Sequence, residues 1–176
     1  DAVLARVYRF TSTLGWYMGG LVYVAGYVSG GRPILYGDPR QVYSALGIYG
    51  DKSFNCNYMP IIESEHVRKA LAFWREGQRL KGVHDSYAFL SFYKVIESQF
   101  ADSVAKVAWL KANIDLLTDL AAARVAELRG SGADVGRHLW ESGRCAVAHA
   151  SLDGALVDPD VHDSRRRLSE DPSILA

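Results

Sequence analysis

The sequence has little cysteine, with only Cys56 and Cys145 among 176 residues, far apart in the chain. Two thiols cannot build a disulfide framework, so the composition favours a reducing compartment and we expect a cytoplasmic protein. Net charge is also missing, since 20 basic and 20 acidic residues balance. Because no overall charge attracts the chain to nucleic acid or to a membrane surface, any anion site has to be local.

Common catalytic and ligand-binding motifs are absent as well. The chain has no Walker loop, no GxGxxG and no GxSxG, and no CxxC or HExxH supports a metal site. We therefore expect neither a cofactor nor a metal. The sequence shows no internal repeat, and its length and 49% hydrophobic content suit one domain over residues 1–176.

The longest uncharged stretch, residues 11–31, is long enough to cross a membrane, but six glycines interrupt it. Its LVYVAGYV segment is rich in β-branched and aromatic residues, which predicts a strand at 21–28 and no membrane contact. Gly30-Gly31 then predicts a turn, and residues 33–37 a returning strand. With a helix at 3–14 before it and an irregular segment after it, this hairpin completes the expected N-terminal part, residues 1–60.

Helical patterns dominate residues 61–176. We expect helices at about 64–81, from 86, at 103–129 and at 135–150, with Gly82 and residues 130–132 as breaks and Asp134 as an N-cap. The loops between them are short, which is typical of antiparallel neighbours. The sequence therefore predicts a mainly α protein, an antiparallel bundle of four or more helices with a small N-terminal β-hairpin. The apolar stripes expected along these helices are Val3, Val7, Phe10 and Leu14; Val67, Ala70, Leu71 and Trp74; and Val104, Val107, Leu110, Ile114, Leu117 and Leu120.

The run ESGRCAVAHA, residues 141–150, sets Arg144 and His149 five residues apart among small apolar residues. On a regular helix, five residues turn the side chain by about 140°, so Arg144 and His149 would not share a face. At helical spacing, one face holds His138, Ser142, Cys145 and His149, and another holds Arg137, Glu141 and Arg144.

Other interpretations of these residues stay open. The Arg137–Glu141–Arg144 stripe is also typical of an exposed ion-pair ladder, worth a few tenths of a kcal/mol per pair. A histidine among Ala and Val is often a core residue that donates to a backbone carbonyl. A metal held by Cys145 and His149 would need a further ligand from elsewhere, and no motif supplies one.

Charged residues also interrupt the apolar helix YAFLSFYKVIESQF, which we expect at the centre of the bundle. A buried charge is costly unless it is paired. Glu97 could therefore orient Arg144 or His149 across the bundle, or it could form a local ion pair on a solvated face. Arg75 and Glu76, in FWREG, raise the same alternative.

The Arg-x4-His spacing of Arg144 and His149, late in a helical bundle, resembles the signature of the HEPN superfamily (higher eukaryote and prokaryote nucleotide-binding domains). More narrowly, the chain resembles the methylamine-utilisation J-like proteins of prokaryotes. The stretches that carry this likeness are RFTSTLGW, KALAFWREG, YAFLSFYKVIES, SGRCAVAHASLDG and VDPDVHDSRRRLSEDP.

The resemblance implies a homodimer in which the motif helices of two chains meet in one composite site. Active members of the superfamily are metal-independent endoribonucleases that leave 2′,3′-cyclic phosphate ends. By resemblance, His149 would be the general acid or base and Arg144 would hold the scissile phosphate. Cys145, Glu97 and Glu141 would support them, although many nuclease members have a polar residue where this chain has Cys145.

The same resemblance allows a different class of function. Many superfamily members are non-catalytic modules for dimerisation or for binding a nucleotide or a partner, and the branch name suggests an accessory protein of amine metabolism. RNA or a nucleotide and a regulatory protein are the partners that we expect, beside a second copy of the chain.

Overall fold

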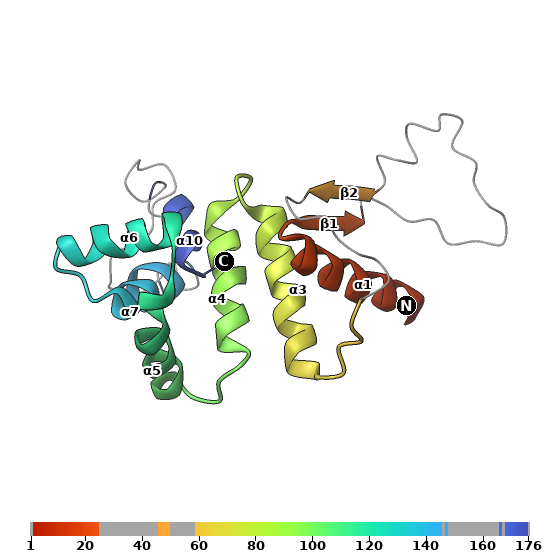
Figure 1. Ribbon diagram of the computed structural model, residues 1–176, viewed down its shortest axis with the longest axis horizontal. Helices are drawn as coiled ribbons and strands as arrows, with labels where there is room; N and C mark the ends of the chain where they lie inside the picture. The colour runs from red at the N-terminus through yellow and green to blue at the C-terminus, as the bar shows by residue number, and fades with distance from the viewer. Residues whose placement is uncertain are drawn as a thin grey trace. The chain divides into compact units, whose positions relative to one another are not determined.

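In a computed structural model of the chain, the described residues are 2–24, 46–49, 59–145, 147, 166 and 168–175, with only the backbone described at 46–49 and 142–143. They fall into two compact units, Asp1–Arg79 and Leu80–Ala176. Helices dominate both units, which confirms the prediction of a mainly α protein (Figure 1). The expected single domain, with a division near residue 60, stays a prediction.

The first unit consists of α1 (Ala2–Met18), β1 (Leu21–Val24), β2 (Leu46–Tyr49) and α3 (Glu65–Leu80). The two strands pair antiparallel and β1 packs against α1. The partner strand β2 comes from the segment that was expected to be irregular. The expected turn at Gly30-Gly31 and the returning strand at 33–37 lie outside the described residues.

Helix α1 extends four residues beyond its predicted end at residue 14. The Thr11 and Ser12 hydroxyls donate to the Tyr8 carbonyl, so these polar side chains are satisfied within the helix. Gly19, with φ of 62°, then ends α1. The Gly19 N–H donates to the Trp16 carbonyl, and the Gly20 N–H donates to the Gly15 carbonyl. The stripe of Val3, Val7 and Phe10 is exposed to solvent rather than buried.

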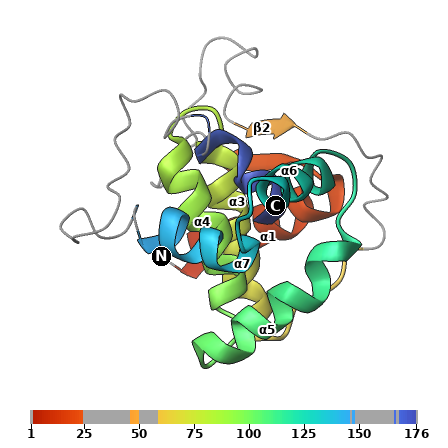
Figure 2. The same cartoon turned by 90° about the vertical axis from the view of Figure 1, so that its left-hand side faces the viewer.

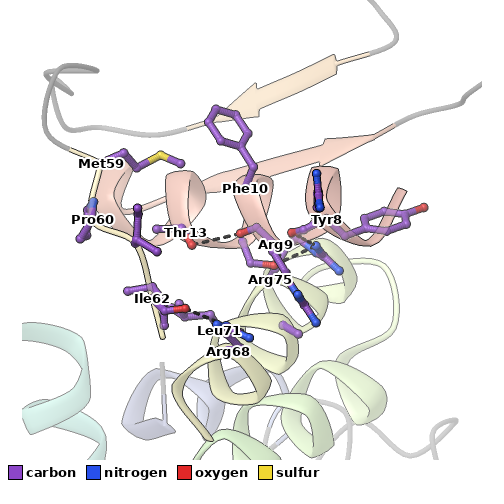
Figure 3. A pocket seen from close by; sticks show the side chains of 14 residues that line it. Tyr8, Arg9, Phe10, Thr13, Met59, Pro60, Ile62, Arg68, Leu71 and Arg75 are labelled. Carbon is purple, nitrogen blue, oxygen red and sulfur yellow. Dashed lines mark hydrogen bonds between the residues drawn. The ribbon is translucent and has the colours of Figure 1, made fainter. Parts of the chain in front are cut away.

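Helix α3 packs on α1 through both apolar and polar contacts. The Ser64 hydroxyl accepts from the Val67 N–H at 3.4 Å, near the predicted start of the helix. Leu71 and Trp74 are buried as expected, and Trp74 meets Trp16 of α1 edge to face with ring centroids 5.3 Å apart. Figure 3 shows Arg75 reaching from α3 to α1, where it donates to backbone and hydroxyl oxygens.

The second unit contains α4 (Asp85–Glu97), α5 (Ser103–Asn113), the short 3-10 helix η2 (Ile114–Leu116), α6 (Asp119–Gly130), α7 (Val135–His138), the π-helical segment η3 (Leu139–Cys145) and α10 (Pro172–Leu175). Helix α10 packs on α4 and α6, and η3 packs on α4 (Figures 1 and 2). The α4 side chains Phe89, Phe92 and Tyr93 are fully buried, as expected for a central helix.

The predicted helix at 103–129 is broken in two. Leu117 is extended, with ψ of 148°, and Asp119 has a positive φ of 52°, so α5 and α6 are separate helices. The predicted stripe is correspondingly wrong at Val104 and Leu120, whose exposed fractions are 78% and 80%. The buried stripe runs instead through Lys106, Leu110 and Ile114, at spacings of four residues.

The predicted regular helix from residue 135 is also wrong over η3. Asp134 caps α7 as expected, its side chain accepting from the Arg137 N–H, but the backbone becomes π-helical from Leu139 to Cys145. A π-helical turn takes more residues than an α-helical turn, so the faces assigned at 3.6-residue spacing do not hold there. None of the helices in the described stretches combines the length and apolarity that a bilayer-crossing helix needs.

Candidate functional site

The site forms where the end of α4 meets α5 and η3. Glu97 is the last residue of α4, and Asp102 starts α5 by accepting the Ala105 N–H at 2.8 Å. This short connection brings Lys106, one turn into α5, back beside Glu97. The η3 segment packs on α4 and supplies Arg144.

One carboxylate oxygen holds two cations. Glu97 Oε1 accepts from Lys106 Nζ at 3.2 Å and from Arg144 Nε at 3.3 Å. The Lys106 side chain is only 6% exposed, whereas those of Glu97 and Arg144 are about one-quarter exposed. The three residues, called here the Glu97 cluster, carry two positive charges against one negative charge. The cluster is therefore a local positive site in a chain without net charge.

Trp140 lies against both cations of the Glu97 cluster. Lys106 Nζ is 4.5 Å and Arg144 Cζ is 5.1 Å from the centre of the indole ring. Cations at this distance are attracted to the negative face of the ring. Trp140 and Glu97 together therefore restrain the Arg144 guanidinium, while part of its side chain still reaches solvent.

Tyr93 lies beneath the cluster with its ring 6.2 Å from that of Trp140. Its hydroxyl is buried and has no hydrogen-bond partner among the described residues. Burial, followed by the negative charge of Glu97, raises the pKa of the Tyr93 hydroxyl well above its usual value. The phenol therefore stays neutral and keeps its proton as a donor.

A cavity of about 500 Å³ opens beside Trp140 and Lys106. The described residues of its lining include Lys111 and the hydroxyl-bearing Ser103, and none of them is a carboxylate. Lys111 is paired with Asp134 at 3.2 Å, so Lys106 supplies the less compensated charge. The cavity combines an aromatic ring with cationic side chains, which suits a ligand that has both a planar group and an anionic group.

The structure brings Arg144 and Glu97 together but does not unite all the predicted site residues. Glu141 is exposed and accepts from Arg137 Nε at 2.9 Å, which forms the Arg137–Glu141 pair of the expected ion-pair ladder. Arg144 pairs with Glu97 instead of Glu141. Cys145 is a free, half-buried thiol. His149 lies outside the described residues. Within the described stretches, no three potential ligands of the His, Cys, Asp and Glu types cluster as a metal site would require.

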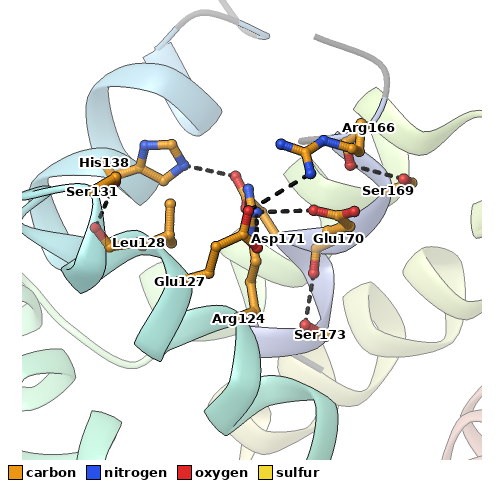
Figure 4. Close-up of polar contacts among 10 residues, drawn as sticks. All are labelled: Arg124, Glu127, Leu128, Ser131, His138, Arg166, Ser169, Glu170, Asp171 and Ser173. Carbon is orange, nitrogen blue, oxygen red and sulfur yellow. Dashed lines mark hydrogen bonds and ion pairs between the residues drawn. The ribbon is translucent and has the colours of Figure 1, made fainter. Parts of the chain in front are cut away.

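A second polar network anchors the start of the motif segment (Figure 4). The Asp171 carboxylate, 1% exposed, accepts from Arg124 Nε at 2.9 Å and lies 2.9 Å from His138 Nε2. Arg124 also reaches Glu127 at 2.7 Å and Glu170 at 2.9 Å. This Asp171 network ties α7 to α6 and to the residues that begin α10, so it positions the chain just before η3.

Sequence patterns missed several of these residues. Lys106 occupies a position in the buried stripe with Leu110 and Ile114, which is a detectable sign of a paired internal charge. Asp171 precedes a proline at the start of a helix, but its partner Arg124 is 47 residues away. No local pattern predicts that pairing, and none predicts the approach of Trp140 to Lys106.

A model of the family described as methylamine utilization protein MauJ matches residues 70–176, which is more than half of the chain. The match contains the whole Glu97 cluster and the Asp171 network, and it leaves out α1 and both strands. No curated protein and no solved structure matches the chain. The chain therefore belongs to the MauJ family of methylamine utilization proteins.

Proposed function

We propose that the chain is a HEPN-like homodimeric, metal-independent endoribonuclease of the cytoplasm, with Arg144 and His149 at its site. The observation that carries the proposal is that the Arg144 side chain is held in a fixed orientation by its neighbours. Its guanidinium is held by the Glu97 carboxylate and the Trp140 ring, and its side chain is still partly exposed. A pre-oriented guanidinium stabilises charge that develops on a phosphoryl group, because little reorganisation is needed during the reaction.

In the proposed reaction, the ribose 2′-oxygen attacks the adjacent phosphorus and the bond to the 5′-oxygen breaks. One His149 takes the proton from the 2′-hydroxyl, and the His149 of the second protomer gives a proton to the leaving 5′-oxygen. Arg144 holds the phosphate, whose product form is a 2′,3′-cyclic diester. Neither a metal nor an external redox partner is needed to balance this step.

Glu97 is a positioning residue in this proposal, since it contacts Arg144 rather than the substrate. Lys106, held by the same oxygen, adds positive charge beneath Trp140. Positive charge at this point attracts the RNA backbone in a chain whose overall net charge is zero.

A second copy of the chain is the partner that the proposal requires. The second unit exposes large apolar side chains that would gain by being covered, namely Val104, Trp109, Leu116 and Leu120. An endoribonuclease also calls for control, and a regulatory protein partner is part of the proposal for that reason.

The experiment is cleavage of structured and unstructured RNAs by the purified protein in EDTA, scored for 2′,3′-cyclic phosphate ends. We expect the wild type to cleave and His149→Ala to lose at least about 100-fold. Glu97→Gln should lose less, about tenfold, because the amide still accepts a hydrogen bond from Arg144 but carries no charge. Equal cleavage by the wild type and His149→Ala would contradict the residue assignment.

The second candidate function is a non-catalytic module that binds a nucleotide or a partner. The pairing of Arg144 with Glu97 favours it, because a carboxylate on the guanidinium competes with a phosphate. This candidate predicts a dimer that binds AMP near Trp140, with quenching of its fluorescence, and that cleaves none of the RNAs. Cleavage that depends on His149 would exclude it.

A further inference from the structure

The first unit contains a basic cavity of about 410 Å³ between α1, residues 59–62 and α3 (Figure 3). Among the described residues, its lining holds four arginines and no carboxylate side chain. In a chain where acidic and basic residues balance, this is a marked local excess of positive charge. The arginines are Arg6 and Arg9 from α1, and Arg68 and Arg75 from α3.

Arg75 is held in place entirely by neutral groups. Its Nη1 donates to the Tyr8 carbonyl at 2.6 Å and to the Ser12 hydroxyl at 2.8 Å, with the Thr11 hydroxyl at 3.3 Å. Its guanidinium carbon lies 4.9 Å from the centre of the Tyr8 ring. The donors on Nε and Nη2 have no acceptor among the described residues. The guanidinium is therefore fixed by one nitrogen and has donors left for a ligand.

Arg75 is also half-buried without a carboxylate at ion-pair distance among the described residues. Burial lowers the pKa of its guanidinium and outweighs the opposing effects of Tyr8 and Glu76. Arg6 and Arg9 likewise form no ion pair within the described stretches, whereas Arg68 has Glu65 at 3.5 Å. A half-buried cation in this state would be stabilised by an anion that enters the cavity.

The other walls of the cavity are apolar. Leu71, Ile62 and Pro60 line it beside the guanidinium groups. A volume of about 410 Å³ is in the range of cavities that bind small organic molecules, and a bare inorganic anion would leave these apolar walls uncovered. The cavity therefore suits a molecule with an anionic head and an apolar body.

We propose that this cavity binds a small organic anion, with its phosphate or carboxylate head on Arg75 and Arg9 and its apolar body against Leu71 and Ile62. A carboxylate and a phosphate each present two oxygens that can accept the two parallel N–H donors of a guanidinium. Most of the cavity lies before residue 70, outside the stretch that the family model matches. The site is therefore independent of the proposed ribonuclease activity.

Calorimetric titration of the full chain tests the proposal, with four probes at one low salt concentration. Phenyl phosphate and phenylacetate carry both an anionic head and an apolar body, inorganic phosphate has only the head, and benzyl alcohol has no charge. We expect phenyl phosphate or phenylacetate to bind at least about tenfold more tightly than inorganic phosphate and benzyl alcohol. The tighter of the two organic anions identifies the head group.

A matched pair of variants locates the binding. Arg9→Glu reverses an exposed charge that lines the cavity, and Lys69→Glu makes the same change on the exposed surface of α3 outside the lining. We expect Arg9→Glu to weaken binding at least about tenfold and Lys69→Glu to change it less than about twofold. Neither residue holds the fold together, so both variants should stay folded.

Three outcomes would overturn the proposal. If neither organic anion binds at millimolar concentration, the cavity takes no such ligand. Inorganic phosphate or benzyl alcohol binding as tightly as the organic anions would show that the head and the body do not act together. Equal weakening by Arg9→Glu and Lys69→Glu would place the effect in the general charge of the protein.

Discussion

Arg75 in the first unit and Arg124 in the second are both internal arginines, but their surroundings differ. Arg124 contacts three carboxylates within 3 Å, those of Glu127, Glu170 and Asp171. In the part of the chain that the structure describes, Arg75 contacts carbonyl, hydroxyl and ring groups and no carboxylate. Burial lowers the pKa of both guanidinium groups, but for Arg124 the hydrogen bonds of Glu127 and Asp171 outweigh burial and raise it.

The difference separates an arginine that holds the fold from one that is prepared for a ligand. Three carboxylates compensate the charge of Arg124, whereas no described carboxylate lies at ion-pair distance from Arg75. Arg144 is intermediate in charge compensation, because the Glu97 carboxylate that pairs with it also pairs with Lys106. We infer that the number of carboxylates on each guanidinium indicates how far it is available to a negatively charged partner.

The largest effect is expected from Arg124→Met. It leaves the Asp171 carboxylate buried without its cation, and the free energy of unfolding should fall by about 3–5 kcal/mol. Urea unfolding followed by circular dichroism measures this change. The double variant Arg124→Met/Asp171→Leu should recover most of the loss, since no buried charge is left alone. A loss below about 1 kcal/mol in Arg124→Met would contradict a structural role.

Arg75→Met should have a smaller effect on stability, about 1 kcal/mol, measured in the same way. The Thr11 and Ser12 hydroxyls keep their hydrogen bonds to the Tyr8 carbonyl, so no buried polar group is left unpaired. The variant should nevertheless lose phenyl phosphate binding in the first unit. A loss of stability as large as that of Arg124→Met would remove the distinction between the two arginines.

The sequence was informative where the physical cause is local. The capping side chain of Asp134 and the positive φ of Gly82 lie where the helix breaks were predicted. It also raised two interpretations for Glu97, and the structure brings Glu97 to Arg144. The Asp134 cap and the Gly82 turn depend on hydrogen bonds and backbone geometry within a few residues, whereas Glu97 and Arg144 are 47 residues apart and meet through tertiary packing.

The sequence was a poor guide where distant segments decide the outcome. The pairing of β1 with β2 crosses 21 intervening residues, and the Asp171 network joins residues 47 apart. The π-helical segment has no local marker either, because the packing of η3 on α4 is a tertiary contact. The site differed from the expectation for this reason, since Lys106 belongs to α5 and reaches Trp140 and the Arg144-bound carboxylate through tertiary packing.

A smaller effect is expected at the cap of α7. The Arg137 N–H, followed by Lys111, lowers the pKa of Asp134 in the folded state. The free energy that the ionised Asp134 side chain adds to folding is therefore fully present above the unfolded-state pKa of about 4. It is lost as the pH falls through the lower pKa of the folded state. Asp134→Ala should cost about 1 kcal/mol at pH 7, and the difference from wild type should vanish in acid.

Urea unfolding at pH 7 and at decreasing pH measures this difference. Asp115→Ala is the control, because Asp115 pairs with Arg129 on the exposed surface and caps no helix. It should change the free energy of unfolding by less than about 0.5 kcal/mol. A difference between Asp134→Ala and wild type that persists unchanged in strong acid would contradict the capping role of the carboxylate.

The most direct test of the account compares RNA cleavage and thermal unfolding in Arg144→Gln and Arg137→Gln. Both variants neutralise an arginine of the same chain segment, but the ion-pair partner of Arg137 among the described residues is the exposed Glu141. The account predicts that Arg144→Gln loses at least about 100-fold in cleavage while its unfolding midpoint stays close to wild type, and that Arg137→Gln keeps both. Cleavage by Arg144→Gln at the wild-type rate, or no cleavage by the wild type on any RNA, would contradict it.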